Sequence, residues 1–243
     1  MKAVILVAGV SRRLYPLTEH RPKCLMEVGG RTILDHQLAA LKAVGVREVC
    51  LVLGYRREQI MAHVQQHYPE LSFEFRVNHH FFETNTALSL LAAADTFLDR
   101  DFIYLNGDVL FEPALLARVV ASPHRAALAV EAKPCGDEEV KAVVDGSGRI
   151  SALAKTLDPA TALGEFIGVA RFNAPFTAWF YKALEAIKHE GLRNAYFEAA
   201  LDRMAPDHAM HAVDVTDLPC IEIDFPEDYE AACAQVVTRF QRA

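Results

Sequence analysis

Four positively charged side chains lie close together just after the first apolar segment of the chain, residues 2–8. They are Arg12, Arg13, Arg21 and Lys23. The whole protein has 25 Lys and Arg residues against 32 Asp and Glu residues, a net charge of −7, so this local excess of cations needs a reason. Guanidinium and ammonium groups pair well with phosphate oxygens, and backbone N–H groups in a glycine turn, here at Gly9, also bind anions. The loop therefore predicts a polyphosphate site, with a solvated basic loop as the alternative.

The glycine pattern of this loop separates it from two other phosphate-binding loops. A dinucleotide-binding loop has Gly-x-Gly-x-x-Gly, and a P-loop ends in Gly-Lys-Ser/Thr. The segment Ala8-Gly9-Val10-Ser11-Arg12-Arg13 has neither pattern. A nicotinamide or flavin enzyme of the Rossmann type and a P-loop protein are therefore disfavoured.

Alternating strands and helices must position this loop. Continuous apolar runs predict buried strands at 2–8, 49–53, 73–77 and 102–105. Helices are predicted between them at 33–43, 57–67 and 87–94. Such alternation favours an α/β fold with a mainly parallel sheet and helices on both faces. Ligands bind beyond the carboxyl ends of the central strands of such a sheet, which is where the basic loop begins.

The pattern changes after residue 121. Strands are expected in succession at 126–132, 140–144 and 167–172, which favours an antiparallel extension of the sheet. The remaining elements are expected to be helices at 176–188 and 194–204, strands at 211–213 and 221–223, and a closing helix at 226–240. Because the sequence has neither a Ser/Gly-rich linker nor a repeat, we expect a single domain over residues 1–243, with a small β-rich lid at about residues 125–215.

Composition excludes several classes of protein. Apolar residues make up 52% of the chain and charged residues 23%, which fits a packed protein rather than a disordered one. The net negative charge disfavours a general binder of nucleic acid or of anionic membranes. Apolar runs fall short of the ~20 residues of a membrane span, and the N-terminus does not resemble a signal peptide. The five scattered cysteines have no Cys-x-x-Cys spacing, so we expect reduced thiols in a cytoplasmic protein.

The segment Leu6-x-Ala8-Gly9-x(3)-Arg13-Leu14-x-Pro16-Leu17-Thr18-x(3)-Pro22-Lys23 resembles the signature of the nucleotidyltransferase superfamily, whose members make nucleoside-diphosphate sugars and alcohols. Further motifs of that superfamily follow in the expected order: Asn85-Thr86-x(2)-Ser89-Leu90, Asn106-Gly107-Asp108, Glu139-Val140-Lys141, Gly164-Glu165-x-x-Gly168 and Glu222-Ile223-Asp224-x-Pro226-Glu227-Asp228. The phosphocholine cytidylyltransferase-like branch is the most similar, followed by the sugar-1-phosphate nucleotidyltransferases. The resemblance implies a Rossmann-like mixed sheet of the nucleotide-diphospho-sugar transferase type, with the β-rich lid on the acceptor side.

The loop departs from the family pattern, which usually reads Gly-x-Gly-Ser/Thr-Arg. Ser11 stands in place of the second glycine, and Arg12 stands in place of the Ser/Thr. A serine fits only where the backbone angles are not restricted to glycine, so we expect a loop of different shape. Arg12 is expected either near the phosphates or in solvent.

The resemblance implies that a phosphate oxygen of an acceptor attacks the α-phosphorus of a nucleoside triphosphate, and that pyrophosphate leaves. Because the acceptor is already an oxyanion, catalysis needs positioning and charge neutralisation rather than a protein nucleophile. By the same resemblance, Arg13 binds the β- and γ-phosphates and Lys23 binds the α-phosphate. A Mg²⁺ cofactor held by Asp108 and Asp224 is implied as well, because crowded phosphate charge must be neutralised. For Asp108 the alternative is a cap of the helix that begins near Pro113.

Substrate contacts are implied by the resemblance in the same way. The nucleotide, taken as CTP from the nearest branch, is expected against Val7, Ala8, Gly9, Arg12, Asn78, Thr84, Asn85 and Gly107. The acceptor, a phosphorylated small molecule, is expected to place its phosphate on Lys155 and a hydroxyl or ammonium group on Glu165. A choline head group would need an aromatic cage, for which the candidates, each with an ordinary core role as the alternative, are Tyr15, Phe81, Phe82, Phe166 and Trp179.

The leading hypothesis is a Mg²⁺-dependent cytidylyltransferase that moves CMP from CTP onto a phosphocholine-like alcohol phosphate or a phosphonate, without nucleic-acid partners or membrane insertion. A sugar-1-phosphate nucleotidyltransferase that uses another triphosphate is the alternative enzyme. A non-catalytic nucleotide-binding module is disfavoured because Arg13, Lys23, Asp108 and Asp224 are present together. A glycosyltransferase usually has Asp-x-Asp, from which Asn106-Gly107-Asp108 departs.

Overall fold

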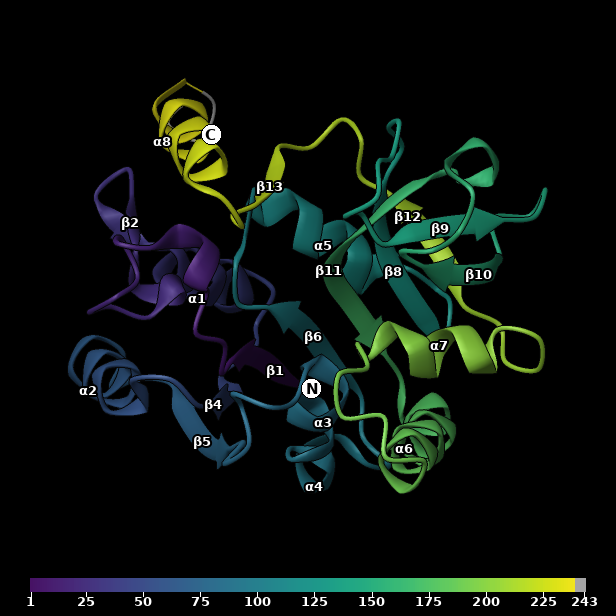
Figure 1. The fold of residues 1–243 in the computed structure, drawn as a ribbon, viewed down its shortest axis with the longest axis horizontal. Coiled ribbons are helices and arrows are strands. Elements are labelled where there is room, and N and C mark those ends of the chain that lie inside the picture. Colours follow the sequence, from purple (N-terminus) through teal and green to yellow (C-terminus); the bar gives the residue numbers. More distant parts are fainter. Residues whose placement is uncertain (239–243) are drawn as a thin grey trace.

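A central sheet lies between two groups of helices in the computed structural model, which describes residues 1–238 (Figure 1). One half of the sheet is formed by four parallel strands: β1 (Lys2–Val7), β4 (Glu48–Leu53), β5 (Ser72–Val77) and β6 (Phe102–Asn106). Strand β1 pairs with both β4 and β6, and β4 also pairs with β5. This arrangement confirms the predicted α/β fold, with the first apolar segment at the centre of the sheet.

The alternation of side chains along β1 explains why helices cover both faces. Val4 and Leu6 pack into one apolar cluster, while Ala3 and Ile5 pack into another. The first cluster also contains side chains of α3 (Thr86–Leu91), α4 (Ala94–Phe97), α6 (Ala174–His189) and α7 (Glu198–Met204). The second contains side chains of α1 (Ile33–Ala43), α2 (Arg57–His67) and α5 (Pro113–Ala121). The prediction of helices on both faces is therefore confirmed.

The second half of the sheet is largely antiparallel, as predicted. Strand β11 (Gly164–Phe172) runs antiparallel to β6 and joins the two halves. On its other side it pairs with β8 (Ala126–Glu131), which pairs in parallel with β12 (His211–Asp214). The hairpin of β9 (Lys141–Val144) and β10 (Ile150–Ala154) attaches to the beginning of β11.

A pair of short strands brings two distant acidic segments together. Strand β7 (Val109–Phe111), which the sequence did not predict, pairs antiparallel with β13 (Cys220–Glu222). Val109 lies opposite Glu222, so Asp108 and Asp224 lie at the same end of this ladder. Helix α8 (Pro226–Thr238) follows, and the part of the predicted closing helix beyond residue 238, as far as Phe240, lies outside the described residues. A second hairpin, β2 (Glu27–Val28) and β3 (Arg31–Thr32), precedes α1.

Two predicted helices differ from the structure. The helix expected at 87–94 is divided, because the chain leaves α3 after Leu91 and α4 begins only at Ala94. The helix expected at 194–204 begins at Glu198 instead. Its first residues bond elsewhere: the Phe197 N–H donates to Thr86 Oγ1, and the Ala195 carbonyl accepts from the Ala87 N–H. These tertiary hydrogen bonds replace the first turn of the expected helix.

Two further features of the described chain agree with the sequence. All five cysteines are free thiols. None of the helices within residues 1–238 combines the length and apolar character that spanning a bilayer requires.

Candidate active site

A cavity of about 360 Å³ opens beyond the carboxyl ends of β1 and β6. Most of the residues predicted to bind substrates or metal line it: Ala8, Gly9, Arg12, Arg13, Lys23, Thr84, Asn85, Gly107, Asp108, Lys155 and Asp224. Val7 instead lines a small adjoining cavity of about 50 Å³, which also touches Lys23 and Asp108. Asn78 and Glu165 lie outside the lining of the 360 Å³ cavity. The fold thus brings predicted site residues from the early and the late parts of the sequence together in one cavity.

In the loop after β1, the surroundings of Gly9 and the backbone conformation of Ser11 both differ from those expected. A Cβ atom at Gly9 would meet open space, so this glycine leaves room in the cavity rather than relieving a steric clash. Ser11 has a left-handed backbone, with φ of 54° and ψ of 50°. This is the conformation that glycine favours, so the expectation that serine requires a loop without it was wrong. The Thr18 hydroxyl donates to the Ser11 carbonyl at 2.8 Å and helps to hold this conformation.

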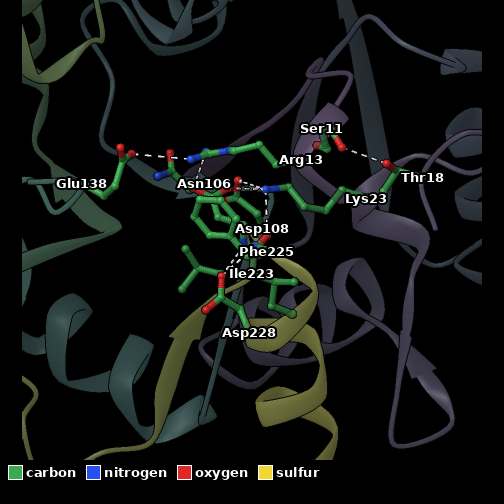
Figure 2. Close-up of polar contacts among 12 residues, drawn as sticks. Ser11, Arg13, Thr18, Lys23, Asn106, Asp108, Glu138, Ile223, Phe225 and Asp228 are labelled. Atoms are coloured by element: carbon green, nitrogen blue, oxygen red, sulfur yellow. Dashed lines mark hydrogen bonds and ion pairs between the residues drawn. The ribbon is translucent and has the colours of Figure 1, made fainter. Parts of the chain in front are cut away.

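Lys23 and Arg13 point toward the acidic segment that follows β13 (Figure 2). Lys23 Nζ lies 2.8 Å from Asp108 Oδ2 and 2.8 Å from Asp224 Oδ1, and it also donates to the Ile223 carbonyl. Arg13 donates to Asp224 Oδ2 at 2.6 Å, and its other terminal nitrogen lies 3.5 Å from Glu138. The predicted cations and aspartates therefore meet in one charged network.

Burial and neighbouring charges shift the pKa values of Lys23 and Asp224 in opposite directions. Burial of Lys23 opposes its charge, but the carboxylates of Asp108 and Asp224 outweigh that effect and raise its pKa above the ordinary value. Burial likewise opposes the charge of Asp224, yet Lys23 and then Arg13 lower the pKa of that carboxyl. Both groups are therefore charged at neutral pH.

Contacts from β1 and α1 fix the turn that carries Asp108. The glycine before it packs against β1, where a Cβ atom at Gly107 would lie 2.4 Å from the Leu6 carbonyl oxygen. Gln37 of α1 donates to the carbonyls of Asn106 and Val109, on either side of Asp108. The N-cap residue of α5 is Glu112, so the alternative that Asp108 caps that helix is wrong. The role of Gln37 was not predicted, because only the tertiary fold brings α1 to this turn.

Three carboxylates form a cluster that could hold a cation. Ligand oxygens of Asp108, Glu222 and Asp224 lie within 4.8 Å of one another. Asp108 Oδ1 is buried and has no hydrogen-bond partner among the residues that the structure describes. Burial, together with the charges of Asp108 and Asp224, raises the pKa of Glu222 well above its ordinary value. A divalent cation with oxygen ligands would satisfy all three groups, so the donor set fits Mg²⁺.

Glu222 was not among the predicted ligands, although the sequence carries a signal for it. It lies two residues before Asp224 at the end of β13, and alternate residues of a strand share a face. Asp228, in the first turn of α8, accepts hydrogen bonds at Oδ2 from the backbone N–H groups of Asp224 and Phe225. This cap fixes the turn that carries Asp224.

Lys155, which was predicted to contact the acceptor, lines the cavity. Its Nζ lies 5.1 Å from the centre of the Tyr196 ring and 3.5 Å from Glu138 Oε2. The buried ammonium group of Lys141 donates to the carbonyl of Lys155, which ties this residue to β9. Glu138 therefore bridges Arg13 and Lys155, a contact that the sequence did not predict.

Glu165 lies in a neighbouring cavity of about 590 Å³ rather than beside Lys155. Its carboxylate is 2.6 Å from the ammonium group of Lys133. Burial raises the pKa of Glu165, although Lys133 opposes the shift. The structure thus pairs this predicted acceptor ligand with a lysine of the same chain and places it outside the lining of the cavity that contains Lys155.

Asn78 is a positioning residue for the predicted nucleotide side. Its amide nitrogen donates to Thr84 and Ser89 at 2.9 Å each, and its oxygen accepts from the His80 N–H. All of these partners lie within the chain, so its amide holds the turn that leads to α3 instead of facing the cavity. Thr84 and Asn85, at the end of this turn, do line the cavity.

The candidate aromatic cage is only partly assembled. Phe81 and Phe166 line the cavity that contains Lys23, together with Tyr196, which had not been predicted. Trp179 lies in a separate cavity, stacked on His208. Of the remaining basic residues, Arg12 lines the same cavity as Lys23, whereas Arg21 pairs with Glu27 and is half exposed.

The chain matches a family model described as "Nucleotidyl transferase" over residues 2–139. CMP-5'-(3-aminopropyl)phosphonate synthase of Streptomyces rubellomurinus is 34% identical over 245 residues, which cover 96% of this chain and 38% of that protein. CTP:phosphoglutamine cytidylyltransferase of Campylobacter jejuni is 26% identical over 254 residues, which cover 95% of this chain and 98% of that protein. The chain therefore spans well under half of the first relative and nearly all of the second.

A solved structure shares the fold over nearly the whole chain. The CTP:phosphocholine cytidylyltransferase from Streptococcus pneumoniae superposes with a TM-score of 0.80 at 19% identity, covering 97% of this chain and 98% of that one. This likeness shows that the mixed sheet has the nucleotidyltransferase architecture.

Proposed function

The chain belongs to the nucleotidyl transferase family, and from that premise we propose that it is a Mg²⁺-dependent cytidylyltransferase. It transfers CMP from CTP onto the phosphate or phosphonate group of a small molecule and releases pyrophosphate. The observation that carries this proposal is the convergence of Arg13, Lys23, Asp108 and Asp224 in one cavity. The choice of CTP is supported by the names of the two relatives, which refer to CMP and CTP.

In the proposed reaction an oxygen of the acceptor attacks the α-phosphorus of CTP. The bond from that phosphorus to the bridging oxygen breaks as the new P–O bond forms, and pyrophosphate carries the electron pair away. The attacking oxygen is already an anion, so the protein supplies in-line positioning and charge neutralisation. No side-chain nucleophile is required.

Lys23 and Arg13 differ in exposure, and this difference supports separate roles for them. The Lys23 side chain is 11% exposed and held by two carboxylates, so its charge is fixed beside the reacting α-phosphate. The Arg13 side chain is 46% exposed and can turn toward the leaving β- and γ-phosphates. Gly9 leaves open space in the loop between them and the nucleoside.

Asp108, Glu222 and Asp224 would hold the Mg²⁺ ion. When bound, Mg²⁺ supplies neutralisation of phosphate charge. Asp108 and Asp224 also keep Lys23 in place, so they would orient a cation of the protein as well as a metal.

Lys155 is the proposed contact for the acceptor phosphate or phosphonate. It lines the same cavity as Lys23, and Lys141 fixes its backbone. The nucleoside is proposed to lie against Ala8, Gly9, Thr84 and Asn85, with Gly107 beneath it.

A panel of nucleoside triphosphates and acceptors tests this function. Purified protein with Mg²⁺ is offered CTP, UTP, dTTP, GTP or ATP, each with an alkylphosphonate, phosphocholine or glucose 1-phosphate, and pyrophosphate release is measured. We expect release to need both substrates and to be fastest with CTP and a phosphonate or alcohol phosphate. Turnover confined to a sugar 1-phosphate and another triphosphate would favour the alternative enzyme. Absence of turnover with every pair, in folded protein, would overturn the proposal.

A further inference from the structure

Glu198, the first residue of α7, is a buried acid that the proposed reaction does not use. It is 5% exposed and lines the same cavity as Lys23 and Lys155. Its Oε2 atom has no hydrogen-bond partner among the residues that the structure describes. Leaving a buried carboxylate oxygen unpaired is costly, and buried charges are ordinarily paired. A ligand that donates to this oxygen would remove that cost.

The backbone around Glu198 is held by the beginning of α3, which also lines the cavity. The Phe197 N–H donates to Thr86 Oγ1 at 2.9 Å, and the Arg193 carbonyl accepts from the Asn85 N–H at 3.0 Å. Because the residues before α7 are bonded to the beginning of α3, the carboxylate is delivered to a fixed position. Glu198 is therefore a preorganised group rather than a mobile surface acid.

Charge distribution in the cavity favours a cation at this position. Lys155 lines the same cavity and is proposed to hold the acceptor's phosphate or phosphonate, so an acceptor must satisfy a cation and an anion of the protein together. A hydroxyl group would bond to Glu198 without neutralising it, whereas an ammonium group does both. The rings of Phe166 and Tyr196 line the same cavity, and ring faces attract a cation further.

Burial raises the pKa of Glu198 to about 7, with the charge of Lys155 opposing the shift. A bound cation favours the charged form of such a carboxyl and restores the lower pKa. Glu198 is therefore an acid in the cavity lining whose charged form a cationic ligand would stabilise.

We propose that Glu198 binds an ammonium group of the acceptor, so that the substrate class is an amino-bearing alkylphosphonate or alkyl phosphate. This inference rests on the proposed function, since it identifies the acceptor of the same reaction. Lys155 takes the anionic end of the acceptor, and Glu198 takes the cationic end.

A matched pair of acceptors tests the inference. 3-Aminopropylphosphonate and butylphosphonate differ by an ammonium group in place of a methyl group and have nearly the same size. With CTP and Mg²⁺, we expect kcat/KM for the amino acceptor to exceed that for the alkyl acceptor by at least about 100-fold, mostly through KM, because the buried carboxylate is left unpaired by a methyl group. Glu198→Gln should bring this ratio close to one.

Glu185→Gln serves as the control and should keep the wild-type ratio, because Glu185 pairs with Lys188 and His189 of α6 and is not part of the cavity lining. A wild-type ratio close to one, with both acceptors turned over, would overturn the inference and leave the proposed function standing. An unchanged ratio in folded Glu198→Gln would also overturn it. If that variant does not fold, the wild-type ratio decides alone. Three results together would overturn both proposals. Neither acceptor is turned over, calorimetry detects no binding of 3-aminopropylphosphonate, and no pair in the triphosphate panel releases pyrophosphate.

Discussion

Lys23 shows how a single side chain can serve two purposes in this cavity. Its ammonium group donates to Asp224 Oδ1 and to the Ile223 carbonyl, and it forms an ion pair with Asp108. Without it, two carboxylates would face each other in a partly buried site. Lys23 is thus placed both to keep the acidic cluster together and to present positive charge to a phosphate.

Replacing this lysine gives a sharp prediction. Lys23→Ala should lower kcat for pyrophosphate release by about 10²–10³-fold, because one preorganised charge is lost from the transition state. Lys188→Ala, at an exposed position at the end of α6, is the control and should retain turnover. Thermal unfolding of each variant shows whether it is folded. Turnover of folded Lys23→Ala within a few-fold of wild type would remove Lys23 from the catalytic machinery.

Sequence reasoning located the residues whose roles follow from strand ends and family motifs. Lys23, Asp108 and Asp224 are of this kind. Glu198 was missed because its significance lies in burial and in an oxygen without a partner in the described chain, which only the tertiary structure reveals. Glu222 was missed although its position two residues before Asp224 was a signal, and the structure adds its burial beside Asp108 and Asp224. Glu165 was predicted to bind the acceptor, but Lys133, far away in sequence, already pairs with it.

Helix α1 shows how an element is fixed beside the site. Thr32 and Asp35 form a capping box, in which each side chain accepts from the backbone N–H of the other. The second oxygen of Asp35 accepts from the Tyr68 hydroxyl at 2.8 Å and bonds to His63 of α2 at 2.7 Å. Since Gln37 on the same helix holds the turn around Asp108, the cap also supports the acidic cluster.

Removing this cap should reduce stability. We expect Asp35→Ala to lower the free energy of unfolding by about 1–3 kcal/mol, because the cap and two hydrogen bonds to a charged group are lost. Asp207→Ala, at an exposed position after α7, is the control. Urea unfolding at neutral pH gives the difference, and equal stability of Asp35→Ala and wild type would contradict this role.

Acid should abolish the contribution of the Asp35 carboxylate to the free energy of unfolding. Burial of Asp35 favours its neutral form, but the hydrogen bonds from His63 and Tyr68 outweigh burial and hold its pKa well below the ordinary value. The contribution is fully present above the unfolded-state pKa of about 4 and is lost as the pH falls toward the lower folded-state pKa. The stability difference between wild type and Asp35→Ala should therefore shrink below about pH 4.

Elements with strong periodicity were predicted closely, and those fixed by distant partners were not. Helices α1 and α2 agree with the predicted bounds because their apolar spacing and flanking residues suffice. Residues 194–197 carry helical spacing, yet their backbone bonds to the beginning of α3 instead. Strand β7 is three residues long and is defined by its pairing with β13, which sequence spacing does not encode.

At the scale of the whole molecule, the cavity joins the two halves of the sheet. The parallel half supplies the loop after β1 and the turn after β6, while the later half supplies Lys155, Glu198 and the acidic segment after β13 (Figure 1). The nucleotide is proposed to bind mainly to the first half and the acceptor to the second. Reaction then depends on both halves holding the two substrates in line across the cavity.

Phosphorus NMR of the reaction mixture tests the central claim most directly, because it observes the bond that the protein is proposed to form. The sample contains the protein, CTP, Mg²⁺ and 3-aminopropylphosphonate. The account predicts two coupled phosphorus signals from CMP joined to the phosphonate, with pyrophosphate appearing in equal amount. The account would be contradicted if CTP stays intact, or if only free CMP and pyrophosphate form without the coupled product. This result would have to hold with 3-aminopropylphosphonate and also with phosphocholine and glucose 1-phosphate in its place.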